Sequence, residues 1–307
     1  MDICVFGAGS LGSLVGGLLA HQGHEVTLVG RDPHVAAIRE RGLSVRGECN
    51  IEVHPAARTS PPATTELAIV TTKAQDVPAA AEALQGVPST VLCLANGMGG
   101  EERLADRLAA PVLAGRSTYG ADQTAPGVVE CTGLGEIVLG PPAGGTDTLA
   151  DRVGEAFTPA LENRVVMDMP YRRWEKLAVN AGINAPTALA RVTNGALADE
   201  PGRELARSAA LEVARVARAE GVELGDEQAV AALEQVVAET TTNRSSMYQD
   251  VAAGRQTEVD AISGFVIERA TAQDIETPVN ETLTRLIRGW ELAHDLREPP
   301  DERFSSD

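Results

Sequence analysis

The chain has 307 residues, of which 43% are hydrophobic and 3% aromatic, and its formal net charge is −18. This size and hydrophobic content can bury one or two sizeable cores, and two domains are the better expectation. The acidic balance argues against nucleic acid or an anionic membrane as a partner. No apolar run approaches the ~18 residues expected of a membrane-spanning helix.

Only two of the 26 basic residues are lysine, Lys73 and Lys176. An acidic, lysine-poor and aromatic-poor composition resembles that of extreme halophiles, in which a hydrated acidic surface keeps proteins soluble in molar salt. In such a chain arginine can replace lysine wherever only charge matters. The two remaining lysines are therefore candidates for positions that need a compact, titratable ammonium group.

The four cysteines, Cys4, Cys49, Cys93 and Cys131, are scattered and include no C-x-x-C pair. This spacing predicts buried, reduced thiols in a cytoplasmic protein, and neither a disulfide framework nor a metal site.

The N-terminus carries the strongest local motif. Ile3 to Phe6 is a continuous apolar run typical of a strand buried on both faces. A G-x-G-x-x-G loop follows, then a helical stretch through Ala20 and a second strand over 25–29; the loop residues are Gly7, Ala8, Gly9, Ser10, Leu11 and Gly12. Such a loop alone is a weak signal, but between a strand and a helix it is the dinucleotide fingerprint, with the diphosphate at the helix N-terminus.

The end of the second strand indicates which dinucleotide binds. NAD sites usually place an acid here, whereas NADP sites place an arginine near the 2′-phosphate. Arg31 comes first and Asp32 second, which favours NADPH. Asp32 could bind ribose or could instead cap the following helix.

Further apolar runs predict the remaining strands of a doubly wound parallel sheet, an α/β fold: 66–72, 91–95, 112–115, 128–130, 136–140 and 164–166. We expect the runs at 128–130 and 136–140 to be antiparallel additions, and 148–157 to be a helix. Lys73 and Asn96 each follow a strand, where doubly wound sheets bind ligands. The alternatives are a surface lysine and an ordinary Asn-Gly turn.

From Pro170 onward the pattern is helical, over 172–185, 204–220, 227–239, 259–272 and 281–292. We expect Pro186 to close or kink the first helix, and Asp226 and Thr277-Pro278 to begin later ones. The predicted organisation is a Rossmann domain over 1–167, a helical substrate domain over 168–296 and a disordered tail over 297–307.

Lys176, Asn180 and Asn184 recur at steps of four in the first of these helices. Side chains at this spacing form one stripe, roughly 12 Å long at ~1.5 Å rise per residue. One ammonium and two amides above an apolar opposite face suit a polar ligand, although a solvated helix face is the alternative. That opposite face contains Trp174, Leu177, Ala178 and Ala181.

Two polar patches lie farther along the chain. Residues 245–250 (SSMYQD) are expected in a break between helices, and residues 257–260 (TEVD) at the start of one. An acid such as Glu258 in a first helical turn can simply complement the helix dipole.

The order of ANGMG, WEKLAVNAGINAPTA, SSMYQD and TEVDAISG behind a Rossmann half resembles the ketopantoate reductase family of the 6-phosphogluconate-dehydrogenase-like superfamily. The likeness covers roughly residues 1–292. It implies NADPH-dependent reduction of 2-dehydropantoate to (R)-pantoate, in pantothenate and coenzyme A biosynthesis. Arg116, where the family commonly has small residues, is a difference near the expected cleft.

The resemblance also implies roles for individual residues. Lys176 would be the proton donor, and Glu258 the second catalytic residue at the junction of cofactor and substrate. Besides the glycine loop, the implied cofactor contacts are Arg31, Lys73, Asn96, Ala121 and Glu258. The implied substrate contacts are Asn96, Lys176, Asn180, Asn184, Asn194 and Ser246.

This chemistry suits the residue types, because an ammonium group can stabilise a developing alkoxide and protonate it, which arginine cannot. No metal is required. Two alternatives remain: an NADP-dependent reductase of another 2-keto acid on the same scaffold, and a non-catalytic NADPH sensor. The helical half could bury a homodimer face or only its own core.

Overall fold

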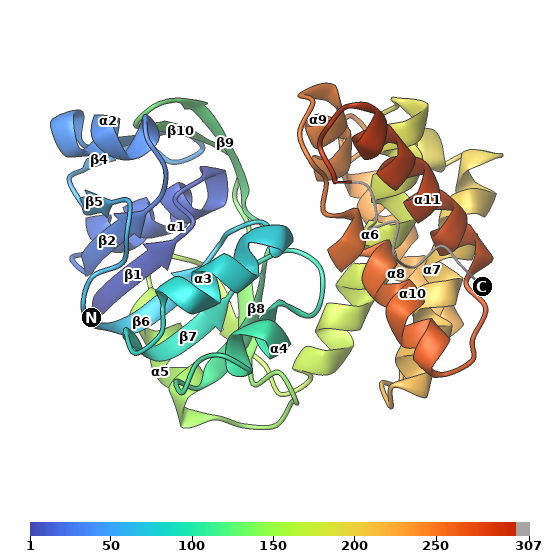
Figure 1. Cartoon of the computed structure of the whole chain (residues 1–307), viewed down its shortest axis with the longest axis horizontal. Helices are drawn as coiled ribbons and strands as arrows, with labels where there is room; N and C mark the ends of the chain where they lie inside the picture. The colour runs from blue at the N-terminus through green and yellow to red at the C-terminus, as the bar shows by residue number, and fades with distance from the viewer. Residues whose placement is uncertain (299–307) are drawn as a thin grey trace. The chain divides into compact units, whose positions relative to one another are not determined.

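The computed structural model describes residues 1–298, which divide after Pro170 into two compact units. The first unit, which begins at Met1, is α/β, and the second, which begins at Tyr171, is helical (Figure 1). The α/β class and the helical second half predicted from the sequence are confirmed.

The main sheet of the first unit has eight strands in the order β12-β11-β8-β7-β6-β1-β2-β5. The strands are β1 (Asp2–Phe6), β2 (Glu25–Val29), β5 (Ala56–Arg58), β6 (Thr65–Val70), β7 (Pro88–Cys93), β8 (Val112–Ser117), β11 (Ile137–Gly140) and β12 (Asn163–Val165). Neighbours pair in parallel except β8 and β11. The antiparallel addition expected at 136–140 is therefore confirmed.

Both faces of this sheet are covered by helices, which explains the continuous apolar runs of its strands. Ile3 and Val5 of β1 belong to the core beneath α1 (Ser10–His21) and α5 (Thr148–Phe157). Cys4, between them, belongs to the core beneath α3 (Val77–Ala83) and α4 (Gly100–Ala105). Side chains that alternate along β1 thus fill two separate cores.

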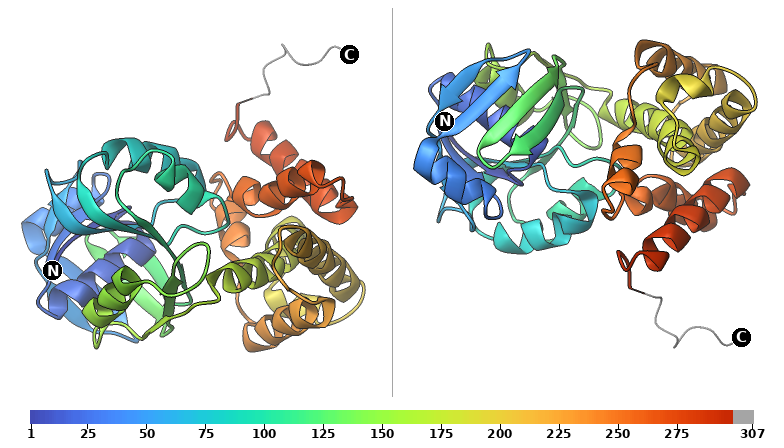
Figure 2. Two further views of the ribbon diagram at one scale, coloured as in Figure 1. Left: turned by 90° about the horizontal axis from the view of Figure 1, so that it is seen from below. Right: turned by 90° about the horizontal axis from the view of Figure 1, so that it is seen from above.

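A second sheet of four strands was missed in the sequence. Its order is β4-β3-β10-β9, from β3 (Leu43–Gly47), β4 (Ile51–Val53), β9 (Gly120–Ala125) and β10 (Val128–Gly133) (Figure 2). The expectation that 128–130 extends the main sheet was wrong: β10 pairs in parallel with β3 and antiparallel with β9. Val45 and Val129 place this sheet on the α1 side of the core. The short helix α2 (His34–Arg41) precedes β3, and the 3-10 turn η1 (Ala74–Asp76) precedes α3.

The second unit is helical over its described residues: α6 (Met169–Ala190), which starts just before the unit boundary, η2 (Asn194–Leu197), α7 (Gly202–Ala219), α8 (Asp226–Glu239), α9 (Ser246–Ala252), η3 (Val259–Ala261), α10 (Ser263–Ala272) and α11 (Pro278–Ala293). The starts predicted at Asp226 and Thr277-Pro278 are confirmed. Glu212 of α7 accepts hydrogen bonds from Val279 N (2.9 Å) and Asn280 N (2.9 Å), which satisfies the first turn of α11.

Three local expectations differ from the structure. Of the two outcomes expected at Pro186, closure is wrong, because α6 continues through the proline to Ala190. Ser246 begins the helix α9, so 245–250 is not a break: the Ser245 hydroxyl accepts a hydrogen bond from Tyr248 N at 3.0 Å and caps it. Arg297, the first residue of the expected tail, is held by ion pairs with Asp260 and Glu291. The rest of that expectation, from Pro299 onward, falls outside the described residues.

Candidate functional site

In the first unit, the predicted cofactor groups follow the carboxyl ends of β1, β2, β6 and β7. These strands are parallel neighbours, so the loops after them emerge at one edge of the sheet. Arg31 follows β2, Lys73 follows β6 and Asn96 follows β7. The structure thus places these three side chains on loops of the same edge as the glycine loop, where such sheets bind ligands.

Backbone hydrogen bonds tie these loops to one another. Gly7 N and Ala8 N both donate to Val29 O, at 2.9 and 2.8 Å. The Thr71 hydroxyl donates to Gly7 O at 2.9 Å, and Leu94 N donates to Val70 O at 2.8 Å. The shape of the edge is therefore determined mainly by backbone groups.

The glycines of the loop have different surroundings. The backbone of Gly7 has φ +109°, a value that residues with a side chain rarely adopt. A Cβ on Gly12 would lie 2.3 Å from Gly7 O and 2.4 Å from Thr71 Oγ1, so the helix can approach the strand only without one. A Cβ on Gly9 would meet only Gly7 O, at 4.0 Å. Gly9 therefore has open space beside it, and Gly12 has none.

These surroundings fit a diphosphate. The first N–H groups of a helix have no intrahelical acceptor, and the helix dipole favours an anion there. Gly9 is the N-cap of α1, and no side chain caps that terminus. The open side of Gly9 lets a ligand approach the backbone, so the residues present fit the diphosphate of a dinucleotide.

Asp32 and Arg31 have separate partners. Asp32 Oδ1 accepts a hydrogen bond from Ala36 N at 3.1 Å, so its carboxylate caps the start of α2. Of the two roles left open for Asp32, the structure displays the capping role. The Arg31 guanidinium donates to Asp76 Oδ2 at 3.1 Å; the Arg31 side chain is 86% exposed and that of Asp76 is 43% exposed.

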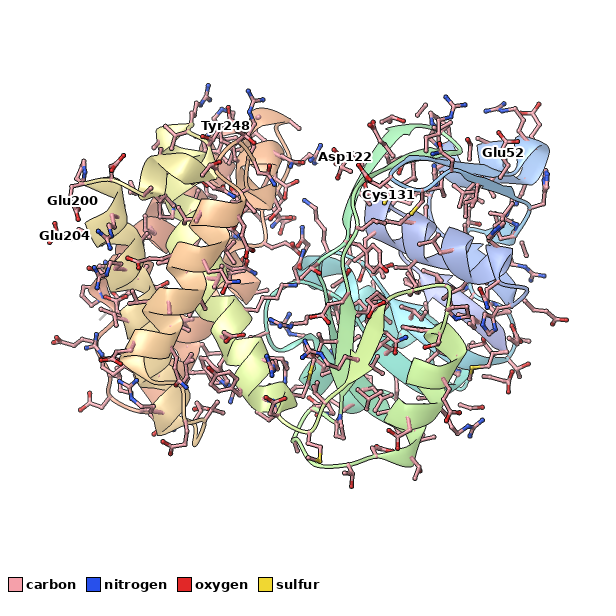
Figure 3. All side chains as sticks on the ribbon, turned by 180° about the vertical axis from the view of Figure 1, so that it is seen from behind. Glu52, Asp122, Cys131, Glu200, Glu204 and Tyr248 are labelled. Carbon is pink, nitrogen blue, oxygen red and sulfur yellow. The ribbon has the colours of Figure 1, made fainter. Side chains whose placement is uncertain are left out.

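Ala121 lies on β9, in the sheet that the sequence did not predict. It pairs with Cys131 of β10, and Figure 3 labels Cys131 and the adjacent Asp122. Two residues on, Gln123 N donates to the Ser10 hydroxyl at 2.9 Å. This bond holds β9 beside the glycine loop, so the structure brings the Ala121 strand to the loop.

All four cysteines are free, as expected, but Cys49 is only half-buried. Burial raises the pKa of the Cys4 thiol to about 12 and, with a hydrogen bond to Cys131, that of Cys49 to about 11. Because the thiolate is the reactive form, these two thiols are poor nucleophiles at neutral pH.

In the second unit, α6 carries the predicted stripe. Lys176 and Asn180 are half-buried, and Asn184 is buried. The opposite face is buried as expected, with Trp174 4% and Leu177 2% exposed. Trp174 packs against Phe265 of α10 with ring centroids 5.9 Å apart. Packing of the apolar face fixes the rotation of α6, and that rotation aligns the stripe.

Ser246 is tied to the same helix through its neighbour. The Thr187 hydroxyl, one turn beyond Asn184, lies 2.8 Å from the Ser245 hydroxyl, the N-cap of α9. The structure therefore brings Ser246 to the C-terminal part of α6. Asn194 has a different setting: it is buried, and its amide donates to Thr240 Oγ1 at 2.9 Å, at the end of α8.

Glu258 lies in the segment between α9 and η3 and is the N-cap of η3. Its carbonyl accepts hydrogen bonds from Ala261 N (3.1 Å) and Ile262 N (3.2 Å). The residue before it, Thr257, is buried and donates to Glu291. The backbone on either side of Glu258 is thus fixed by hydrogen bonds.

Three residues that shape these sites were missed in the sequence: Thr71, Asp76 and Thr187. Thr71 lies at the carboxyl end of the apolar run predicted over 66–72, at the ligand-binding edge, and that position was a usable signal. Asp76 lies 45 residues after Arg31, and Thr187 lies 58 residues before Ser245. Nothing local in the sequence indicates either pair.

Within residues 1–298 no group of three or more histidine, cysteine, aspartate or glutamate side chains is placed to hold a metal ion. Over the same range, none of the helices combines the length and hydropathy that crossing a bilayer requires.

Two family models match the chain. The model described as "Ketopantoate reductase PanE/ApbA" matches residues 3–144, and "Ketopantoate reductase PanE/ApbA C terminal" matches residues 168–291. The chain is 43% identical over 299 residues to the 2-dehydropantoate 2-reductase of Halobacterium salinarum, covering 94% of this chain and 98% of that one. It is 37% identical to the enzyme of the same name from Pyrococcus horikoshii, covering 95% and 98%.

Two solved structures are similar to this chain over nearly its whole length. A PanE/ApbA family ketopantoate reductase from Ralstonia eutropha superposes with a TM-score of 0.89 at 30% identity, covering 96% of this chain and 100% of that one. D-mandelate dehydrogenase in complex with NADH and anilino(oxo)acetate superposes with a TM-score of 0.90 at 26% identity, covering 97% and 100%.

Proposed function

The chain belongs to the ketopantoate reductase family, and on that premise we propose that it reduces 2-dehydropantoate to (R)-pantoate with NADPH, for pantothenate and coenzyme A synthesis. The observation that carries the proposal is the stripe of Lys176, Asn180 and Asn184 on α6. It is aligned by a buried opposite face and lies within the part of the chain that the C-terminal family model matches.

The first unit would bind the dinucleotide. The glycine loop and the start of α1 would hold the diphosphate through backbone N–H groups. Arg31 would meet the 2′-phosphate of NADPH, and the capping role of Asp32 supports this choice over NADH because that carboxylate is already engaged with Ala36 N. Lys73, Asn96 and Ala121 would complete the cofactor contacts.

Bound NADPH would supply a hydride to C2 of the keto acid. As the carbon–oxygen double bond becomes single, negative charge develops on the oxygen. The Lys176 ammonium would stabilise that charge and transfer a proton from Nζ to the oxygen, which completes the alcohol. The neutral amine would then regain a proton from solvent before the next turnover.

The other polar groups would orient the substrate. Asn96, Asn180, Asn184, Asn194 and Ser246 would hold its carboxylate and hydroxyl without a further positive charge beside Lys176. Such orientation lowers the entropic part of the barrier. Glu258 would act where cofactor and substrate meet. We assign residues 1–167 to cofactor binding and 168–296 to substrate binding.

The test is an assay of 2-dehydropantoate reduction in molar KCl, in which oxidation of the cofactor is followed by its absorbance. NADPH and NADH are assayed separately as cofactors. We expect rapid turnover with NADPH and 2-dehydropantoate and slow turnover with NADH. Tight NADPH binding without turnover on any keto acid would instead favour a non-catalytic sensor.

A second candidate is reduction of a different 2-keto acid. The likeness to D-mandelate dehydrogenase, which was solved with an aromatic oxoacetate analogue, favours an aromatic keto acid as the competitor to test. Phenylglyoxylate should therefore be assayed beside 2-dehydropantoate. A higher kcat/KM for phenylglyoxylate would keep the fold and the role of Lys176 but change the substrate.

We also propose that the enzyme works in the cytoplasm of a halophile. A net charge of −18 with only two lysines supports the salt requirement, and free cysteines support a reducing compartment. Activity should rise with KCl concentration up to the molar range. Full activity and stability in dilute buffer would contradict the salt requirement.

A further inference from the structure

A buried carboxylate lies near the end of α11. Glu291 has no exposed surface, and each of its oxygens has two donors. Oε1 accepts from Thr257 N at 2.8 Å and from the Thr257 hydroxyl at 2.6 Å. Oε2 accepts from Arg297 Nε at 2.8 Å and Nη2 at 2.7 Å. A charge withdrawn from water needs partners of this kind.

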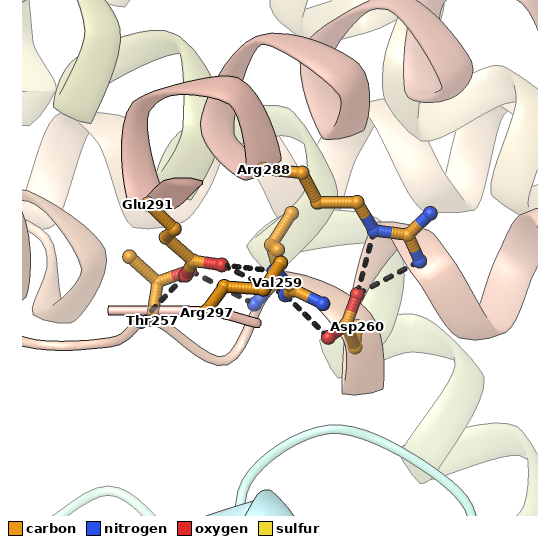
Figure 4. A network of polar contacts seen from close by, with 6 residues as sticks. All are labelled: Thr257, Val259, Asp260, Arg288, Glu291 and Arg297. Carbon is orange, nitrogen blue, oxygen red and sulfur yellow. Dashed lines mark hydrogen bonds and ion pairs between the residues drawn. The ribbon is translucent and has the colours of Figure 1, made fainter. Parts of the chain in front are cut away.

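Arg297 extends this arrangement to a second carboxylate. Its Nη2 also contacts Asp260 Oδ2, while Asp260 Oδ1 accepts from Arg288 Nε and Nη2, both at 2.8 Å (Figure 4). The Arg297 side chain is 20% exposed, compared with 45% for Asp260 and 44% for Arg288. Arg297 is thus the more buried arginine and the one that joins Glu291 to Asp260.

The two anchored residues, Thr257 and Asp260, lie on either side of Glu258 in the chain. Thr257 is held by a residue 34 positions later and Asp260 by one 37 positions later. In addition, Val259 N donates to the Thr257 hydroxyl at 3.3 Å. The segment that presents Glu258 is therefore fixed from both sides by α11 and the residues that follow it.

Burial of the Glu291 carboxylate is not expected to contribute much to the stability of the fold. Replacing a buried ion pair with well-packed apolar groups is often neutral or stabilising, so the buried pair is weak evidence for a role in stability. The guanidinium of Arg297 has a rigid fork of donors that can fix two acceptors at once. The arrangement thus favours a role in geometry.

We propose that Glu291 and Arg297 are positioning residues that hold the 257–260 segment so that Glu258 is correctly placed for the reduction. This inference rests on the proposed function, because it takes Glu258 to act at the reacting centre. Neither Glu291 nor Arg297 is among the residues proposed to touch substrate or cofactor; both would act through Thr257 and Asp260.

The test compares three arginine variants of the full chain. Arg297→Gln removes the bridge between the two carboxylates. Arg288→Gln removes only the outer partner of Asp260. Arg285→Gln is the matched control. Arg285 lies on α11, as Arg288 does, its side chain is 77% exposed, and it pairs only with Glu281 among the ion pairs described. For each, kcat, KM for 2-dehydropantoate and Kd for NADPH are measured, with circular dichroism to verify folding.

We expect Arg297→Gln to lower kcat about 10- to 100-fold, because misplacing a catalytic group by about 1 Å can cost about 100-fold. Arg288→Gln should cause a smaller loss and Arg285→Gln none. Kd for NADPH should change much less than kcat in all three, since the first unit would build the diphosphate site and Glu258 is only one of the proposed cofactor contacts. Arg297→Lys keeps the charge but not the fork, and should restore part of the lost kcat.

A second variant covers the case in which Arg297→Gln does not fold. Thr257→Val keeps the shape of the side chain and removes one of the two donors to Glu291 Oε1, and it should lower kcat much more than it raises Kd for NADPH. If folded Arg297 and Thr257 variants keep wild-type kcat and lose only thermal stability, the pair is structural and the inference is wrong. If wild type itself fails to reduce 2-dehydropantoate, the proposed function fails, and this inference with it.

Discussion

The two units build their candidate sites by different means. At the sheet edge of the first unit, the glycine loop is shaped by backbone hydrogen bonds to Val29 O and by the absence of Cβ atoms at Gly7 and Gly12. In the second unit the candidate groups are side chains of α6 and of other segments such as α9 and the start of η3. They are aligned by packing and by bonds between distant residues, such as Thr187 with Ser245.

This difference determines how each site should respond to substitution. A backbone site tolerates changes of side chain but not added volume where the chain makes a close approach. A side-chain site tolerates volume changes at its periphery but not the loss of one functional group. Substitutions at each site therefore test whether the two sites respond in these different ways.

The largest effect is expected at Lys176. Lys176→Arg keeps the positive charge but removes the transferable proton, because arginine stays protonated in proteins. We expect kcat to fall about 100- to 10,000-fold, the range that general acid catalysis contributes, with circular dichroism unchanged. Lys73→Arg is the control: as a cofactor contact it should mainly raise KM for NADPH. A Lys176→Arg enzyme with wild-type kcat would exclude Lys176 as the proton donor.

The glycine loop allows a paired test of the backbone site. In Gly12→Ala the new Cβ would lie 2.3 Å from Gly7 O, so the loop must shift. We expect a loss of about 1–3 kcal/mol in unfolding free energy, typical of overpacking, together with loss of NADPH binding.

In Gly9→Ala the new Cβ would meet only Gly7 O at 4.0 Å, so stability should be unchanged. It would, however, occupy the space proposed for the diphosphate, and Kd for NADPH should rise. Urea unfolding and NADPH fluorescence titration measure the two quantities. Unchanged NADPH binding in Gly9→Ala would show that the diphosphate does not bind on that side of the loop.

The contrast also explains how much of the fold could be read from the sequence. The strand-loop-helix at the N-terminus is local: its apolar run, its glycines and the helix occur within about twenty residues, and it was predicted correctly. Thr277-Pro278 likewise predicted the start of α11 through local capping rules.

What was missed depends on distant partners. The strand β3 pairs with β10, which begins at Val128, so neither segment alone indicates the four-stranded sheet. Residues 245–250 were expected in a break between helices, but Ser245 caps α9, which begins at Ser246. Arg297 was assigned to a disordered tail because its partners, Glu291 and Asp260, are brought to it only by the folded helices.

A smaller effect is expected at His34, a side-chain link within the backbone-built unit. Its Nδ1 accepts from Gly127 N at 3.0 Å, so Nε2 carries the proton and donates to the Ser13 hydroxyl at 2.9 Å. Burial lowers the pKa of His34 below its ordinary value. Between the folded and unfolded pKa values only the unfolded chain is protonated, so the unfolding free energy falls as pH drops below about 6.5.

This loss should level off once pH passes below the folded pKa, and each unit of pKa difference corresponds to about 1.4 kcal/mol. His34→Gln can keep both hydrogen bonds but cannot titrate. Its urea-unfolding free energy should therefore vary less with pH than that of wild type over the same window. Parallel profiles for the two proteins would show that His34 contributes no pH dependence.

The smallest effect is expected at Asp76, the last residue of η1. Its 3.1 Å ion pair with Arg31 joins side chains that are 43% and 86% exposed, so it contributes little stability. The carboxylate nevertheless lies beside the guanidinium proposed to meet the 2′-phosphate, and like charges repel. Asp76→Asn should therefore lower KM for NADPH about 2- to 5-fold, equivalent to less than about 1 kcal/mol, and leave KM for NADH unchanged.

The measurement belongs at the lowest salt that keeps the enzyme folded, because the screening length falls to about 3 Å at 1 M salt. Asp151→Asn, at an exposed position of α5, is the control for removing one negative charge from the same unit. Equal changes for NADPH and NADH, or a matching change in the control, would mean that Asp76 acts only through net charge. A change confined to NADPH would identify Arg31 as the residue beside the 2′-phosphate, and would show that side chains decide which dinucleotide a backbone-built edge accepts.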